Sequence, residues 1–152
     1  SSVNPDGAAA NTRVTASGVD LNRNFPADWL QQGLGSSSWS GPSAGSEAEA
    51  KAVMAFLART DPTALLSFHQ PFAVVDLTHP NSRPAGRRLA TWLGLPAQVV
   101  GCPGPCYGTM TAWADGHLSA IALTVELPKL VTSERVVRSA TAVLRLTRWL
   151  AR

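Results

Sequence analysis

The sequence is short of cysteine, of charge and of long apolar runs, and each shortage excludes a class of protein. Two cysteines cannot complete a structural zinc site built from four sulfurs. Charged residues make up 15% of the 152 residues and apolar residues 45%, which is too little charge for a disordered tail and enough apolar surface for a core. No apolar run approaches the roughly 18 to 20 residues of a membrane helix. The composition therefore predicts one globular domain without a membrane span.

The net charge of +3 is unevenly distributed along the chain. Residues 133–152 carry five arginines and one acidic residue, Glu134, whereas the rest of the chain has eight basic and nine acidic residues. A basic segment indicates a nucleic-acid partner only where its charges can face phosphates. In this segment Val136, Leu144 and other apolar residues recur at helical spacing, with the arginines largely on the other side. We interpret it as a helix with a solvated basic face and predict no nucleic-acid partner.

The two cysteines lie in the segment Cys102-Pro103-Gly104-Pro105-Cys106. Three intervening residues, two of them proline, allow a tight loop whose ends could meet as a disulfide, which would indicate an oxidising compartment. Two free thiols fit the spacing equally well. The sequence leaves both alternatives open.

Local patterns predict alternating helices and strands after a long polar stretch. The first 45 residues are rich in Gly, Ser, Asn and Pro and predict a loop, including a turn at Asn4-Pro5-Asp6-Gly7. A capping box at Ser46-Glu47-Ala48-Glu49 begins the first predicted helix, and Ser82 caps the second. The predicted helices cover 46–60, 82–93 and 133–152, with a helical turn at 108–114, and the predicted strands cover 64–68, 74–77, 98–101 and 120–126. This alternation predicts an α/β fold with a mixed, largely parallel sheet flanked by helices.

Two polar residues interrupt apolar runs where strands are expected to end. His69 follows Leu65-Leu66-Ser67-Phe68, and Glu126 follows Ile121-Ala122-Leu123-Thr124-Val125. The carboxyl ends of parallel strands are where α/β sheets place functional groups. A buried ionised glutamate costs on the order of several kcal/mol unless it is paired or faces a polar cleft. A hydrogen-bonded strand-end histidine and a structurally paired glutamate remain open alternatives at this point.

A third candidate lies in the polar loop Gly18-Val19-Asp20-Leu21-Asn22-Arg23-Asn24-Phe25-Pro26. The guanidinium of Arg23 presents a planar set of donors that matches a carboxylate. The alternative is that Arg23 only ties down the loop.

In combination these segments resemble the zinc carboxypeptidase family. The resemblance runs from Asn4 to about Pro128, and it is closest to the bacterial branch that contains murein peptide amidases. It rests on Asn4-Pro5-Asp6-Gly7, Arg13, residues 18–26, Ser40-Gly41-Pro42 leading into Ser46-Glu47, Ser67-Phe68-His69-Gln70, Gly108-Thr109 to Trp113, and Thr124-Val125-Glu126-Leu127-Pro128. The ordered set is specific, although no single piece is.

The resemblance implies a three-layer α/β domain and a role for each matched residue. His69 matches the last of three zinc ligands, two histidines and a glutamate. Glu126 matches the glutamate that takes a proton from the zinc-bound water and passes it to the leaving amine. Arg13 matches the arginine that stabilises the developing oxyanion, and Asn22 and Arg23 match the pair that holds the free terminal carboxylate of a peptide substrate. The implied cofactor is one zinc ion.

The sequence departs from the family pattern in two ways. The first two zinc ligands of the family come from a His-x-x-Glu segment before Asn-Pro-Asp-Gly, and this chain contains no His-x-x-Glu. His79 and His117 are interpreted as surface turn residues rather than replacements. We therefore expect residues 1–152 to be the C-terminal portion of one catalytic domain, with the N-terminal part missing and its fragment a possible partner. In addition, Asp115 stands where many relatives have a tyrosine, and Tyr107 lies upstream.

The leading hypothesis is a zinc metallocarboxypeptidase that hydrolyses a terminal peptide or isopeptide bond in bacterial cell-wall peptides, with this chain alone inactive. The alternative is a metal-free module that binds peptide carboxylates through Asn22 and Arg23. We expect His69, Glu126, Arg13 and Arg23 to face one cleft. The opening residues lack the features of a signal peptide, so any targeting segment is expected outside this chain. The expected location is secreted or in the cell envelope, with the cytoplasm as the alternative.

Overall fold

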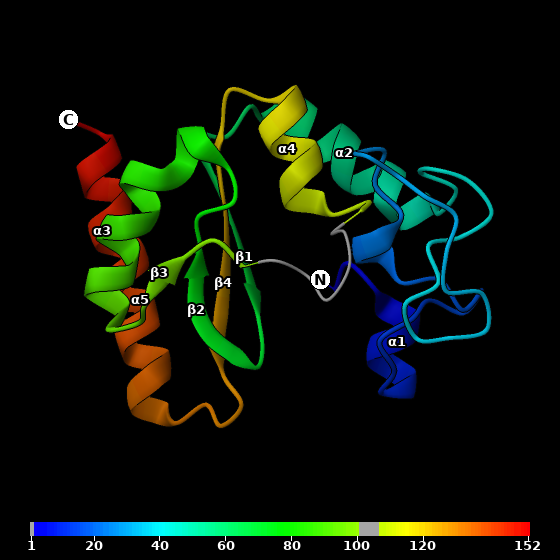
Figure 1. The fold of residues 1–152 in the computed structure, drawn as a ribbon, viewed down its shortest axis with the longest axis horizontal. Helices are drawn as coiled ribbons and strands as arrows, with labels where there is room; N and C mark the ends of the chain where they lie inside the picture. The colour runs from blue at the N-terminus through cyan, green and yellow to red at the C-terminus, as the bar shows by residue number, and fades with distance from the viewer. Residues whose placement is uncertain (1, 101–106) are drawn as a thin grey trace. The chain divides into compact units, whose positions relative to one another are not determined.

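The structure is a computed structural model that describes residues 2–100 and 107–152. Their contacts divide the chain into two compact units, which are described separately: residues 1–62 with 102–118, and residues 63–101 with 119–152. The disulfide alternative at Cys102 and Cys106 lies outside the described residues. The helices and strands labelled in Figure 1 are α1 (Pro5–Ala10), α2 (Ala48–Thr60), β1 (Ala64–His69), β2 (Phe72–Asp76), α3 (Arg83–Leu93), β3 (Ala97–Gln98), α4 (Met110–His117), β4 (Ile121–Pro128) and α5 (Ser133–Leu150). Two short 3-10 turns are η1 (Leu21–Arg23) and η2 (Pro80–Ser82).

The second unit is built on a four-stranded sheet with the strand order β1-β4-β2-β3. β1 and β4 are parallel, β2 and β3 are parallel, and β2 runs antiparallel to β4. A mixed, largely parallel sheet flanked by helices confirms the fold class predicted from the sequence. β2 and β3 begin earlier than the predicted strands, because Phe72 and Ala97 already pair with neighbouring strands.

One face of this sheet is covered by α3 and α5, which lie side by side (Figure 1). Their shared core is apolar and almost completely buried, and it consists of Val75, Ala85, Leu89, Ala90, Leu93, Leu123, Val125, Ala142 and Leu146. Ala85, Leu89 and Leu93 of α3, which are spaced as one face of a helix, lie in this core, and Gly94 follows the helix in a left-handed conformation. This core fixes the side of β4 that faces away from Glu126.

The apolar face predicted for α5 is confirmed only in part, because Leu150 packs against the core whereas Val136 and Leu144 do not. Val136 and Leu144 were predicted to face the core, but they are 57% and 58% exposed, whereas Ala142 and Leu146 are each 1% exposed. The helix has a second apolar stripe, and packing against α3 selects the stripe that contains the small residue Ala142. The guanidinium of Arg135 donates to the carbonyl of Leu93, which joins the two helices at that end.

The first unit contains more regular structure than the predicted loop. Asn4 and Pro5 do not form an isolated turn but begin α1, where Asn4 Oδ1 accepts a hydrogen bond from Gly7 N at 2.9 Å. The rest of the loop is organised by Asn24, which is fully buried. Its Nδ2 donates to Ser40 O and to Ser46 Oγ, at 2.8 and 2.9 Å. One amide side chain therefore connects segments more than 15 positions apart in the sequence.

The two predicted helix caps form differently from the sequence pattern. α2 begins after Glu47 without a side-chain cap, because Ser46 Oγ donates to Glu47 Oε1 instead of closing the predicted capping box. Ser82 occupies the N-cap position of α3, but its Oγ accepts from Ala122 N of β4 at 3.0 Å. Ser46 Oγ also accepts from Asn24 Nδ2, so each of the two serines connects a helix start to another segment. Within the described ranges, no helix combines the length and the apolar character needed to cross a membrane.

Candidate active site

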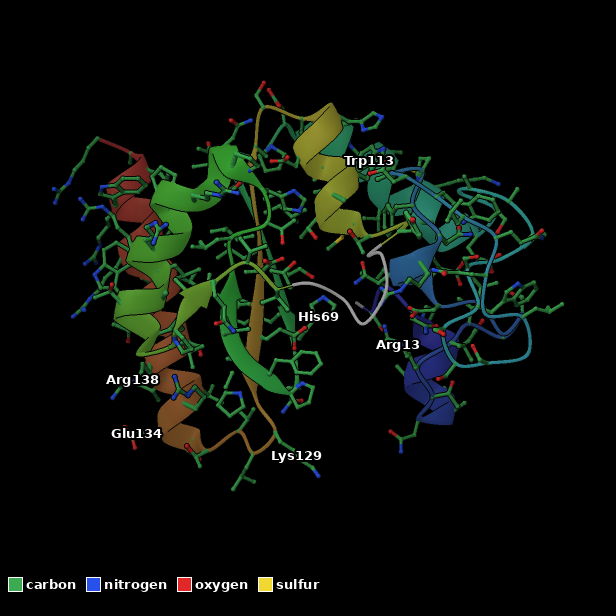
Figure 2. The ribbon with its side chains drawn as sticks, viewed as in Figure 1. Arg13, His69, Trp113, Lys129, Glu134 and Arg138 are labelled. Atoms are coloured by element: carbon green, nitrogen blue, oxygen red, sulfur yellow. The ribbon has the colours of Figure 1, made fainter. Side chains whose placement is uncertain are left out.

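In the second unit, the structure places His69 directly beside Glu126. They are the last paired residues of the parallel strands β1 and β4, and Figure 2 shows His69 at the end of β1. Paired residues on adjacent strands point to the same face of a sheet, so the imidazole and the carboxylate share one face. Had they lain on opposite faces, a common role in one reaction would be excluded. Residues 57 positions apart thus meet through strand register.

The sheet face that carries this pair becomes more polar toward the ends of β1 and β4. Ser67 pairs with Thr124 one step before His69 and Glu126. The alternate residues of the same strands, such as Leu66, Leu123 and Val125, belong to or pack against the core under α3 and α5. Because successive strand residues alternate between faces, the hydrophobic pattern that buries one face directs the polar side chains to the other.

Glu126 lies on β4 between β1 and β2, so it has a paired neighbour on either side. One neighbour is His69 and the other is Val74, which is 1% exposed and offers no polar side chain. Glu126 Oε2 is buried and has no hydrogen-bond partner among the described residues. Because a buried carboxylate oxygen without a partner is costly, this atom is poised for a proton, a water or a cation on the face it shares with His69.

The imidazole of His69 is oriented by its own strand. Its Nε2 lies 2.9 Å from Ser67 Oγ, two residues earlier on the same face of β1. Metal-ligating histidines normally use one ring nitrogen for the ion and the other for such a hydrogen bond, which holds the ring in place. The local geometry of His69 therefore suits a ligand.

The described residues do not by themselves make the zinc site that the family implies. Catalytic zinc is held by three protein ligands. Among residues 2–100 and 107–152, no three His, Cys, Asp or Glu side chains come together as a group that could hold a metal ion. What fits zinc here is one ligand position, His69. A zinc ion bound at His69 would need its remaining ligands from outside the described residues.

In the first unit, Arg13 is held by a buried carboxylate. Its Nε and Nη2 both lie 2.8 Å from Asp20 Oδ2. The arginine side chain is 49% exposed, whereas that of Asp20 is 4% exposed. The buried acid therefore fixes the edge of the guanidinium that carries Nε and Nη2, and Nη1 lies on the edge that does not contact Asp20.

Asn22 and Arg23 lie on the 3-10 turn η1, which is held from two directions. Asp20 Oδ1 accepts from Asn22 N at 3.1 Å and begins the turn. Asn22 Oδ1 accepts from Met110 N at 3.0 Å, which leaves the amide Nδ2 as the donor that a carboxylate needs. Gly108 packs against the Arg23 backbone so closely that a Cβ at this position would overlap the Arg23 carbonyl oxygen. Residues 108–110 thereby clamp the turn.

Sequence reasoning did not identify the residues that hold these candidates in place. Ser67, Asp20 and Met110 act on His69, Arg13 and Asn22 respectively. Asp20 could have been identified from the sequence, because aspartate is typical of an Asx turn, in which its side chain accepts a hydrogen bond from the backbone N–H two residues later. No such pattern exists for Met110, whose contribution is a backbone N–H. We expected His69, Glu126, Arg13 and Arg23 to face one cleft. Arg13 and Arg23 belong to the first unit and His69 and Glu126 to the second, so this expectation stays a prediction.

The other two histidines lie away from His69 and Glu126 in the chain. His117 ends α4 rather than occupying a turn, and its ring stacks on Trp113 with the ring centroids 5.3 Å apart. His79 precedes η2, as its interpretation as a turn residue implies. Asp115 lies on α4.

The fold is of the α/β class, and sequence comparison gives the family of the chain. The family model for zinc carboxypeptidases matches residues 1–92, and the chain belongs to this family. It is 34% identical over 161 aligned residues to murein peptide amidase A of Escherichia coli (strain K12), a match that covers 97% of this chain and 64% of that protein. The corresponding protein of Vibrio campbellii is 32% identical over 143 residues, with 84% and 54% covered. The chain thus spans less than two thirds of the length of these relatives.

Solved structures support the same assignment. The murein-tripeptide amidase of Escherichia coli O157 matches with a TM-score of 0.72 and 29% identity over 97% of this chain and 65% of that one. Carboxypeptidase A of Helicoverpa armigera matches with a TM-score of 0.80 over 98% of this chain and 50% of that one. At 17% identity, the second match shows the shared fold alone.

Proposed function

We propose that this chain carries the proton-transfer and substrate-binding residues of a zinc-dependent amidase that cleaves a terminal peptide or isopeptide bond in bacterial cell-wall peptides. The similarity to murein peptide amidases supports the substrate class. The observation that carries the proposal is the pairing of His69 with Glu126, whose buried Oε2 has no partner within the described residues. A strand end with one candidate ligand beside one available base suits hydrolysis.

Glu126 acts as the base and then as the acid. Its Oε2 accepts a proton from the attacking water and delivers it to the nitrogen of the leaving group, so the carboxylate is regenerated in each turnover. His69 is the protein ligand on the same face, with Ser67 fixing its ring. When bound, zinc would supply Lewis-acid polarisation and a more acidic water.

Arg13, Asn22 and Arg23 bind and polarise the substrate. The edge of the Arg13 guanidinium that does not contact Asp20 stabilises negative charge that develops on the carbonyl oxygen. Asn22 Nδ2 and Arg23 donate to the free terminal carboxylate, which restricts cleavage to chain ends. The Arg23 guanidinium is oriented for this by its hydrogen bond from Nη1 to Asn22 O, at 2.7 Å.

One observation favours the second candidate, a metal-free module that binds peptide carboxylates. The described part of the chain brings no three metal-ligating side chains together, whereas its carboxylate-binding turn is complete and clamped. The two functions predict different behaviour once the missing ligands are supplied. Only the amidase gains turnover.

The test uses the extended protein, meaning this chain joined to the upstream residues that should carry His-x-x-Glu. We expect the extended protein to hydrolyse a murein tripeptide, to lose activity on treatment with a chelator, and to regain it with zinc. Binding of the tripeptide without hydrolysis, at any zinc concentration, would establish the binding module instead.

Replacing Arg23 tests the grip on the terminal carboxylate. In the extended protein, Arg23→Ala should raise KM about 10- to 100-fold for a substrate with a free terminal carboxylate, since a hydrogen bond to a charged group contributes about 1.5 to 3 kcal/mol. The same change should have little effect on the matching amide-capped substrate. Arg59→Ala, an exposed arginine on α2, is the matched control and should leave both KM values unchanged. Equal effects on the two substrates would remove Arg23 from carboxylate recognition.

A further inference from the structure

The carboxylate of Asp20 connects two groups that the proposed function treats as separate. Asp20 is a buried charged residue of the first unit, with 3% of the whole residue exposed. Its two oxygens have different partners: Oδ2 accepts from the Arg13 guanidinium, and Oδ1 accepts from the backbone N–H of Asn22. One side chain thus contacts both the arginine assigned to the oxyanion and the turn assigned to the substrate carboxylate.

The Asp20 backbone is fixed as firmly as its side chain. Asp20 N donates to Trp39 O at 2.8 Å, and Asp20 O accepts from Arg23 N at 2.9 Å. A buried residue with all of these groups engaged has little freedom to move, so the atoms bonded to its two carboxylate oxygens are held at a set separation. The exposed part of the arrangement is Arg13, whose guanidinium is held by this carboxylate.

The anchor determines which edge of Arg13 is available. Nε and Nη2 share Oδ2, so the guanidinium is bound along its side and its Nη1 points away from Asp20. An unanchored arginine with half of its side chain in solvent would sample many rotamers and lose entropy whenever it had to meet a developing charge. Preorganised donors avoid that loss.

We propose that Asp20 is a positioning residue, which sets the spacing between the Arg13 guanidinium and the Asn22–Arg23 carboxylate grip and so matches the site to a substrate of fixed length between scissile carbonyl and terminal carboxylate. The inference rests on the proposed function for its catalytic consequence. The hydrogen-bond geometry itself is independent of that function.

The test uses the fact that the two carboxylate oxygens of Asp20 have different hydrogen-bond partners. In Asp20→Asn, the amide oxygen still accepts from Asn22 N, but the amide nitrogen cannot accept from Arg13. In the extended protein we expect kcat to fall about 10- to 100-fold while KM stays within about twofold. Asp20→Ala removes both contacts and should lower kcat and raise KM. Asp28→Asn makes the same chemical change at an exposed position and should alter neither constant.

A double-mutant cycle shows whether Asp20 acts through Arg13. In an Arg13→Ala background, Asp20→Asn should lower kcat less than about twofold further, because the group it orients is gone. Additive losses would overturn the proposal. Loss of zinc from the Asp20→Asn variant, with Arg13 still present, would also overturn the proposal, because Asp20 would then act on the metal site and not on the arginine.

A readout on the present chain separates this inference from the proposed function. In nuclear magnetic resonance spectra, the Arg13 Nε–H should exchange with solvent at least about 10-fold more slowly in the wild type than in Asp20→Asn, because Asp20 Oδ2 accepts from it. Equal exchange rates would overturn the inference even if the extended protein is an amidase. Slow exchange in an inactive extended protein would contradict the proposed function and leave the anchoring of Arg13 intact.

Discussion

Glu126→Gln in the extended protein should lower kcat by roughly 10² or more while zinc stays bound. Glutamine has nearly the same size as glutamate and remains polar, so packing on β4 beside His69 and Val74 should be preserved. The amide cannot accept the proton of the attacking water or return it to the leaving nitrogen. The loss should appear in kcat with KM little changed, because the proton moves only in the transition state.

Glu134→Gln is the matched control for this prediction. Glu134 is an exposed residue on α5 whose contact with Arg138 is a surface ion pair at 3.3 Å (Figure 2), so its replacement should leave turnover unchanged. Zinc content should be measured for both variants and for the wild type. Unchanged turnover in Glu126→Gln, or loss of its zinc, would remove Glu126 from proton transfer.

The second large effect concerns the present chain by itself, which should hydrolyse no peptide and carry less than about one zinc per chain. The physical reason is the number of donors. Zinc affinity and the acidity of its bound water both depend on several ligands held in fixed geometry, and the described residues bring no three such side chains together. A single imidazole should exchange its metal readily.

The comparison that checks this prediction is between the present chain and the extended protein, purified in the same way. Metal analysis should give about one zinc per extended protein, and only that protein should cleave a murein tripeptide. Tightly held, stoichiometric zinc together with turnover in the present chain would show that its ligands lie among residues not assigned here.

Local sequence patterns predicted the helices and strands that have one clearly apolar face and one clearly polar face. α3 has apolar residues at Ala85, Leu89 and Leu93 and glycine immediately after its end, so its face and its end were both predictable. α5 has two apolar stripes, and the choice between them depends on α3, which lies 40 or more positions away. Its rotation therefore could not be read from its own periodicity.

The candidate site also contains residues that the sequence predicted and residues that it did not. His69 and Glu126 were predictable because each interrupts an apolar strand, and strand register then places them together. The residues that support the site act over longer distances or through the backbone: Asn24 joins loop segments, and Met110 N holds Asn22 from 88 positions away. Such contacts have no local pattern, since a backbone N–H is available at every residue except proline.

The most direct test of the account is a zinc titration of the extended protein, comparing the wild type with His69→Ala. His117→Ala, which removes an exposed histidine at the end of α4, serves as the control. We predict about one tightly bound zinc per molecule in the wild type and in His117→Ala, and at least about a 100-fold weaker affinity in His69→Ala, because a catalytic zinc site loses one of its three protein ligands. Equal zinc affinity in all three proteins would contradict the assignment of His69 as a ligand and with it the proposed role of the His69–Glu126 pair.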